Sequence, residues 1–118
     1  MKIALDAMGG DNAPNVNLEG ARDILAENSE IESILLTGPA DKLEKAAAKC
    51  GLTDTRAIFI DASEVVGMEE SGAKALRRKK NSSISIAADL VKKSDAQALV
   101  SAGNTGAAVA TATVQLRL

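Results

Sequence analysis

Short apolar runs alternate along the chain with longer segments of mixed polarity. Each run is four to seven residues long and is bounded by turn residues or charges, which is typical of buried β-strands. We therefore predict strands at Lys2–Leu5, Ile31–Thr37, Ala57–Ile60 and Ala96–Val100.

The segments between these runs have helical spacing. In the clearest of them the apolar positions i, i+3, i+4 and i+7 are Leu43, Ala46, Ala47 and Cys50. Gly51 follows, where a C-cap glycine is favoured, and the spacing indicates that Cys50 packs into the core. Residues 84–91 repeat the spacing, and Ser82 and Ser83 before them are candidate caps. Residues 14–27 carry a less regular apolar stripe, which consists of Leu18, Ala21, Ile24 and Leu25.

Strands that alternate with amphipathic helices predict βαβ units and a parallel sheet. The expected fold is a three-layer α/β/α sandwich with a mainly parallel, Rossmann-like sheet. Residues 105–118 have helical character with apolar groups nearly all round, and no capping residue closes this segment. We therefore expect residues 1–118 to be the N-terminal part of a single α/β domain that continues beyond Leu118.

The most informative segment follows the first predicted strand. Asp6-Ala7-Met8-Gly9-Gly10-Asp11 is a glycine turn flanked by two carboxylates. Adjacent glycines permit φ > 0 and leave room for close approach of another group. Asp11 or Asn12 is a candidate cap for the next helix, and Pro14 suits its first turn. Because ligands of open α/β sheets bind beyond the strand carboxyl ends, the turn predicts a binding site.

Two further segments have residues suited to binding anions. Ser101-Ala102-Gly103-Asn104-Thr105-Gly106 follows the last predicted strand and opens a predicted helix, so its amides and the helix dipole suit a phosphate or a developing oxyanion. Arg77-Arg78-Lys79-Lys80-Asn81-Ser82-Ser83 places four cations before another predicted helix, although such a run is also typical of a solvated face. In a parallel sheet the glycine turn and the loop 101–106 share one edge, because both follow the carboxyl ends of strands.

Composition narrows the class of protein. Hydrophobic residues make up 46% of the 118 residues but aromatic ones only 1%, so Ala, Ile, Leu and Val must build the core. The net charge of −2 gives no reason to expect nucleic acid or an anionic membrane as a partner. There is no apolar run long enough to span a bilayer and no signal-peptide pattern, and Cys50 is the single cysteine. A cytoplasmic protein is the simplest interpretation.

Several chemistries are excluded within these residues. The sequence has no histidine, which removes Ser-His and Cys-His dyads and histidine-based metal sites, and one cysteine cannot form a zinc cluster. The Walker pattern is absent, and the dinucleotide fingerprint fails on glycine spacing and on the missing acid after the second strand. Anion binding by backbone amides and lysines remains, with no metal expected.

The glycine turn, the basic run 77–83 and the loop 101–106 resemble, in this order and spacing, the bacterial phosphate acyltransferases of phospholipid synthesis, the PlsX family. The resemblance covers nearly all 118 residues, and it departs from the pattern at Asn12, where histidine is common. It implies transfer of a long-chain acyl group from acyl carrier protein to inorganic phosphate, and a fold similar to isocitrate dehydrogenase-like enzymes. It also implies a homodimer, peripheral membrane association, a downstream membrane acyltransferase and no cofactor.

That reaction assigns expected roles. Asn104 and Asp11 are the expected catalytic residues. Lys79 or Lys80 would offset phosphate charge, while Asp6 and Asp11 would either orient the glycine turn and lysines or accept a proton from phosphate. The expected phosphate- and substrate-binding set is Asp6, Gly9, Gly10, Lys79, Lys80, Asn81, Ser82, Ser101, Gly103, Thr105 and Gly106. Two alternatives stay open: a coenzyme A-dependent phosphate acetyltransferase, and a non-catalytic anion-binding domain.

Overall fold

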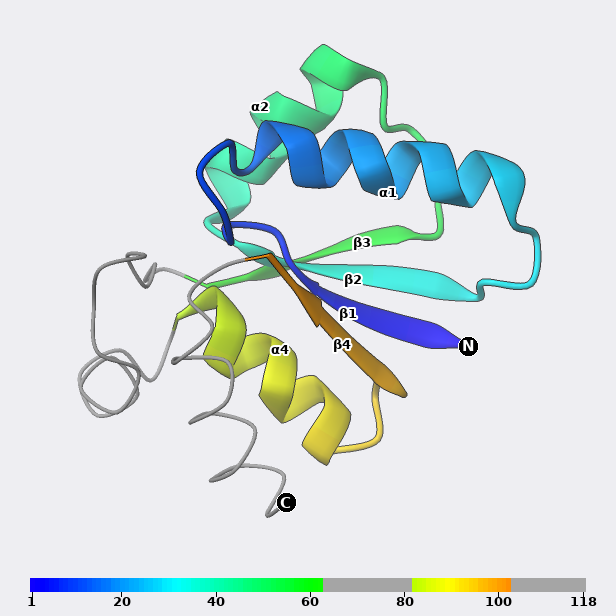
Figure 1. Cartoon of the computed structure of the whole chain (residues 1–118), viewed down its shortest axis with the longest axis vertical. Helices are drawn as coiled ribbons and strands as arrows, with labels where there is room; N and C mark the ends of the chain where they lie inside the picture. The colour runs from blue at the N-terminus through cyan, green and yellow to red at the C-terminus, as the bar shows by residue number, and fades with distance from the viewer. Residues whose placement is uncertain (63–81, 103–118) are drawn as a thin grey trace.

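The computed structural model describes residues 1–62 and 82–102. Strands and helices alternate through them as the pattern of apolar residues predicts (Figure 1). The elements are β1 (Lys2–Asp6), α1 (Asn15–Glu27), β2 (Ser33–Gly38), α2 (Ala40–Cys50), β3 (Ala57–Asp61), α4 (Ser83–Lys92) and β4 (Ala98–Ser101). The helix predicted over residues 105–118 lies outside the described residues.

The strands form one parallel sheet in the order β3-β2-β1-β4. Asp6 at the end of β1 aligns with Thr37 of β2 on one side and Ser101 of β4 on the other. The chain therefore moves from β1 through β2 to β3 in one direction and returns to place β4 on the opposite side of β1. A topological switch point lies between β1 and β4, where open α/β sheets bind their ligands.

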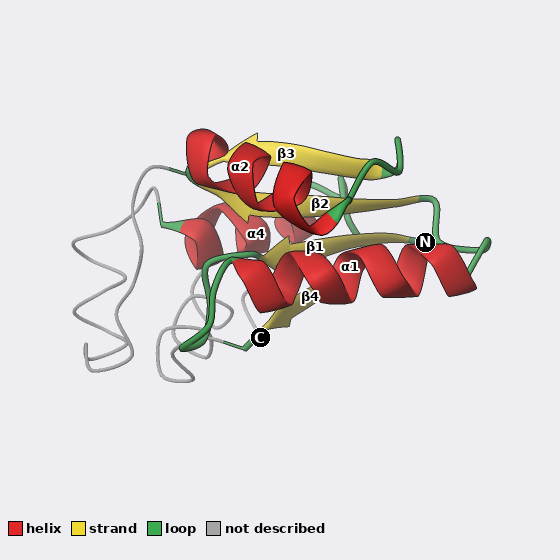
Figure 2. Cartoon of the chain, turned by 90° about the horizontal axis from the view of Figure 1, so that it is seen from above, coloured by secondary structure: helices red, strands yellow, loops and turns green. Residues whose placement is uncertain are grey.

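Helices cover both faces of the sheet. α1 and α2 lie on one face and α4 on the other (Figures 1 and 2). The larger core, on the first face, contains the fully buried side chains of Leu18, Leu25, Leu36 and Leu43. The smaller core under α4 includes Ala4, Leu35, Ala87 and Ala96. Because residues alternate between the faces of a strand, Ile3 and Leu5 pack toward α1 while Ala4 packs toward α4. The predicted three-layer α/β/α class is confirmed.

The helix ends agree with the sequence at two places and differ at a third. Ser82 caps α4 by accepting a hydrogen bond from the Ser85 amide, and Gly51 follows α2 in the left-handed conformation at φ 76°. The prediction that Asp11 or Asn12 caps the first helix is wrong, because α1 begins only at Asn15 and no side chain of the described residues caps it. Those two residues stay in the loop before the helix.

Two side chains are less buried than their helical stripes predict. Ile24 of α1 belongs to the same predicted apolar stripe as Leu18, Ala21 and Leu25, which are buried, yet Ile24 is 42% exposed. Cys50 is half-buried at the end of α2, where it packs against the larger core and its carbonyl accepts a hydrogen bond from Arg22. Within the described residues, no helix is long and apolar enough to cross a membrane.

Arg56 links the ends of several elements opposite the switch point. Its guanidinium donates to the carbonyl oxygens of Leu25, Asn28 (2.9 Å) and Ile31 (3.1 Å), and it pairs with Asp54 at 2.8 Å. These bonds hold the end of α1 and the turn into β2 against the segment that enters β3. Hydrogen bonds from Arg56 lower the pKa of the Asp54 carboxyl below its ordinary value.

Arg56→Lys should therefore lower the urea midpoint of unfolding more than Arg22→Lys does. An ammonium group cannot reproduce the fork that reaches three carbonyls and a carboxylate, whereas Arg22 contacts one carbonyl and one carboxylate. Because the pKa of Asp54 is lower in the folded state, the stabilising contribution of this pair is present above the unfolded pKa and lost as the pH falls through the folded value. Urea titrations at neutral and acid pH check both points; equal effects of the two substitutions would contradict the first.

Candidate active site

The candidate site lies at the carboxyl edge of the sheet, where β1 and β4 end side by side. Asp6, the last residue of β1, is only 4% exposed. Its Oδ1 accepts hydrogen bonds from Ser83 Oγ at 2.5 Å and from the Met8 amide at 3.3 Å, and its Oδ2 accepts from Ser101 Oγ at 2.8 Å. One carboxylate thus ties the glycine turn, the first residue of α4 and the last residue of β4 together.

A second buried side chain supports this junction from β2. Thr37 is fully buried, and its hydroxyl lies 2.7 Å from the Ser83 carbonyl oxygen and 3.3 Å from the Leu5 carbonyl oxygen. The Thr37 carbonyl also accepts a hydrogen bond from the Ala7 amide at 3.0 Å. Buried polar groups need partners inside the protein, and Thr37 finds them here. Together with the hydrogen bond between Asp6 and Ser83, these contacts hold the start of α4 to both β1 and β2.

The glycine turn packs closely against the chain that leaves β4. Gly10 has φ 91°, and a Cβ at this position would lie 3.3 Å from the Ala102 carbonyl oxygen. Asn17 of α1 fixes the turn from the other side, because its Nδ2 donates to the carbonyl oxygens of Ala7 and Gly9 at 2.8 Å each. A side chain at position 10 would both require a disfavoured conformation and crowd Ala102.

A hollow of about 260 Å³ lies in front of this turn. Among the described residues, the backbone amides of Gly10, Asp11 and Asn12 have no hydrogen-bond partner. Successive unpaired amides in a turn form an anion-binding concavity, and a topological switch point is where such a concavity is used. The hollow is lined by Gly9, Gly10, Asp11, Asn12, Ala13, Val16, Asn17 and Ala102.

The described residues bring together only part of the predicted site. Asp6, Gly9, Gly10 and Asp11 lie in or beside the turn, and Ser101 is bonded to Asp6. Ser82 serves as the cap of α4. The remaining predicted site residues lie outside the described residues, and their roles stay predictions: Lys79, Lys80, Asn81, Gly103, Asn104, Thr105 and Gly106.

Sequence reasoning missed the positioning roles of Asn17, Thr37 and Ser83. Thr37 carried a usable signal, because it is a polar residue that directly follows the apolar residues 34–36 in a fully buried strand. Ser83 was predicted to be a helix cap, but its hydroxyl instead donates to Asp6. Asn17 gave no signal, since its bonds depend on how the turn folds back over α1.

Comparison with known proteins shows the family of the chain. A family model described as fatty acid synthesis protein matches residues 1–118. The chain belongs to this family. A curated relative from Akkermansia muciniphila, named phosphate acyltransferase, is 56% identical over 118 residues, which are 100% of this chain and 34% of that protein.

Other relatives carry the same name. The phosphate acyltransferase of Geobacter sulfurreducens is 48% identical over 110 residues, covering 93% of this chain and 31% of that protein. The phosphate acyltransferase of Clostridium botulinum is 46% identical over 114 residues, covering 97% of this chain and 34% of that protein. The resemblance to the PlsX family is thereby confirmed, and the chain spans about a third of the length of the curated relatives it matches.

Proposed function

We propose that the complete protein transfers a long-chain acyl group from acyl carrier protein to inorganic phosphate, giving an acyl phosphate for phospholipid synthesis. The observation that carries this proposal is the row of unpaired amides at Gly10–Asn12, which lies at the switch point beside the loop that leaves β4. Membership of a family whose curated relatives are named phosphate acyltransferases supports it.

The reaction needs one new bond and one broken bond. An oxygen of phosphate attacks the thioester carbonyl carbon, a C–O bond forms, and the C–S bond breaks as the tetrahedral intermediate collapses. The carrier thiolate leaves and takes up one proton, which balances the proton that phosphate loses. Preorganised amide donors lower the barrier because they stabilise the charge that develops on the carbonyl oxygen. No nucleophile from the protein is required.

The contacts favour different roles for the two carboxylates of the turn. Asp6 is buried and its oxygens are engaged by two serine hydroxyls and an amide, so it suits a positioning role. Asp11 is exposed at the hollow and suits a proton acceptor for phosphate. In this proposal Asn104 supplies a further oxyanion donor, and Lys79 and Lys80 offset the charge of phosphate.

The proposal extends to the surroundings of the enzyme. Acyl carrier protein is the donor and inorganic phosphate the acceptor, and the protein works as a cytoplasmic homodimer that contacts the membrane peripherally. A membrane acyltransferase consumes the acyl phosphate. These assignments rest on the resemblance of the three loops to the family.

The full-length protein should incorporate labelled inorganic phosphate into an acyl phosphate that hydroxylamine traps. Hexadecanoyl-acyl carrier protein is the test donor, and acetyl-coenzyme A distinguishes a phosphate acetyltransferase. Release of carrier thiol should depend on phosphate and match acyl phosphate formed one to one. Turnover of acetyl-coenzyme A but not of hexadecanoyl-acyl carrier protein would indicate a phosphate acetyltransferase. Phosphate binding without turnover of either donor would indicate an anion-binding protein.

A further inference from the structure

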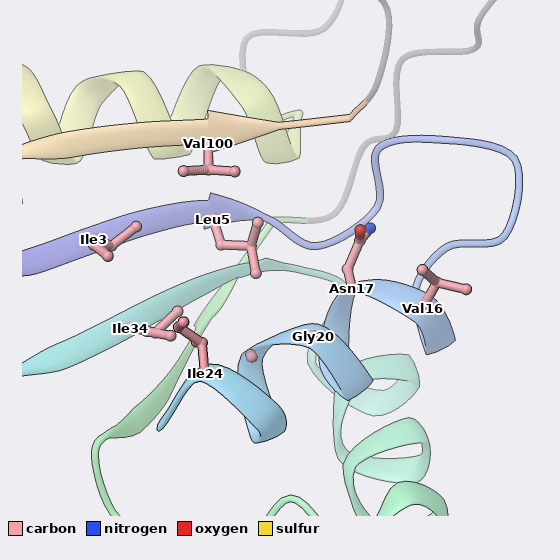
Figure 3. Close-up of a pocket in the computed structure, with 9 residues that line it drawn as sticks. Ile3, Leu5, Val16, Asn17, Gly20, Ile24, Ile34 and Val100 are labelled. Carbon is pink, nitrogen blue, oxygen red and sulfur yellow. The ribbon is translucent and has the colours of Figure 1, made fainter. Parts of the chain in front are cut away.

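An apolar groove runs along α1, between this helix and the strands β1 and β4 (Figure 3). It has a volume of about 310 Å³. Three of its side chains are large, apolar and well exposed: Val16 at 54%, Ile24 at 42% and Val100 at 50%. Ile3 and Leu5 form its floor, and Asn17 is the one polar side chain among the described residues that line it. Exposed apolar side chains gathered on one concave surface indicate a binding surface.

Gly20 leaves room in the wall of this groove. It lies in the middle of α1, where glycine weakens a helix relative to alanine. A Cβ at this position would meet no described atom within 4 Å, so packing within the described residues does not account for the glycine. The missing side chain instead allows an occupant of the groove to approach the helix backbone closely.

The groove adjoins the hollow in front of the glycine turn. Val16 and Asn17 line both, so the groove opens at the switch point where the unpaired amides lie. A thioester whose carbonyl oxygen faced those amides would have its apolar chain directed along α1. The groove is therefore polar at one end and apolar along its length, as an acyl group is.

We propose that this groove binds the acyl chain of the donor substrate, with the thioester at the glycine turn and the tail alongside Gly20 and Ile24. This assignment rests on the proposed function. The volume of the groove lies at the lower end of the range for small-molecule sites, and its mostly aliphatic lining suits a chain of methylenes.

Gly20→Leu in the full-length protein tests the groove through chain length. The leucine side chain would occupy space taken by several methylenes, and leucine is a good helix former, so the helix should persist. We expect kcat/KM for hexadecanoyl-carrier protein to fall about tenfold or more, the scale for losing a few buried methylenes, while hexanoyl-carrier protein stays within about threefold. Ala26→Leu, on the exposed side of the same helix, is the matched control. Equal losses at both chain lengths, or none, would overturn the assignment.

Thiol protection tests the same groove without requiring turnover. In full-length Cys50→Ala protein, an Ile24→Cys thiol should react slowly with maleimide when hexadecanoyl-carrier protein is bound. It should react rapidly with maleimide when hexanoyl-carrier protein is bound or when no substrate is present. Ile58→Cys on β3, where the native side chain is 43% exposed and away from the groove, should be unaffected. Protection of the Ile24→Cys thiol without any substrate would show that the rest of the chain covers the groove. Protection that grows with protein concentration would show that a second copy covers it, and either result refutes the proposal.

The two proposals can fail separately. Protection of the Ile24→Cys thiol by hexadecanoyl-carrier protein without acyl phosphate formation would contradict the proposed reaction and support the groove as an acyl site. Acyl phosphate formation with unchanged chain-length preference in Gly20→Leu and no protection at position 24 would keep the reaction and remove the groove assignment.

Discussion

Asp6→Ala should destabilise the full-length protein by about 2–4 kcal/mol and lower kcat by about 10²-fold or more. Removing the carboxylate takes its acceptor from the buried hydroxyl of Ser83, which is 3% exposed, and also breaks the hydrogen bond that the partly buried Ser101 donates. Each unsatisfied buried polar group costs free energy, and the glycine turn, α4 and β4 lose their common anchor. Urea titrations and steady-state kinetics with varied phosphate measure the two effects.

Asp6→Asn separates positioning from proton transfer. Asparagine keeps the shape and one acceptor oxygen, and its amide nitrogen can donate to a serine oxygen, so a positioning role predicts that kcat stays within about tenfold of wild type. A residue that accepts the phosphate proton would instead lose as much activity in Asp6→Asn as in Asp6→Ala, together with one limb of the pH profile. Wild-type stability and turnover in Asp6→Ala would show that the junction around this carboxylate does not matter.

The sequence predicts the architecture well because its signals are local. The apolar runs and the spacing of Leu43, Ala46 and Ala47 specify strands and a helix without reference to the rest of the chain, and β1–β4 and α2 follow them. The shared edge of the glycine turn and the loop after β4 follows from parallel pairing alone, and the alignment of Asp6 with Ser101 confirms it.

The contacts within the site were harder to predict because they join residues far apart in the chain. Asp6 was expected either to orient the glycine turn and lysines or to accept a proton from phosphate, and its hydrogen bond from the Met8 amide agrees with the first alternative. Its hydrogen bonds with Ser83 and Ser101, which are 77 and 95 residues away, were not predicted. No spacing rule connects such residues. The exposure of Ile24 has a similar origin: its side chain fits the helical stripe, but it lines the groove between α1 and the sheet, where Val100 of β4 is also exposed.

Close packing of the glycine turn on the chain after β4 leads to the last prediction, which concerns Gly10. Gly10→Ala should cost about 1–2 kcal/mol for the left-handed conformation at φ 91° and more for crowding, because the new Cβ would lie 3.3 Å from the Ala102 carbonyl oxygen. That carbonyl precedes residue 103, so moving it displaces the loop we propose to bind the oxyanion. We expect kcat to fall about 10²-fold, the scale for a misplacement of roughly 1 Å.

Gly51→Ala provides the matched control for this substitution. Gly51 also has a positive φ, 76°, but a Cβ there would meet no atom of the described residues within 4 Å, and it lies at the end of α2 away from the site. It should therefore show the conformational cost of about 1–2 kcal/mol without a loss of turnover. The difference between the two variants isolates the contact with Ala102, since both pay the same backbone strain. If Gly10→Ala matches Gly51→Ala in both stability and kcat, the glycine turn is an ordinary connection, and the anion site must lie elsewhere.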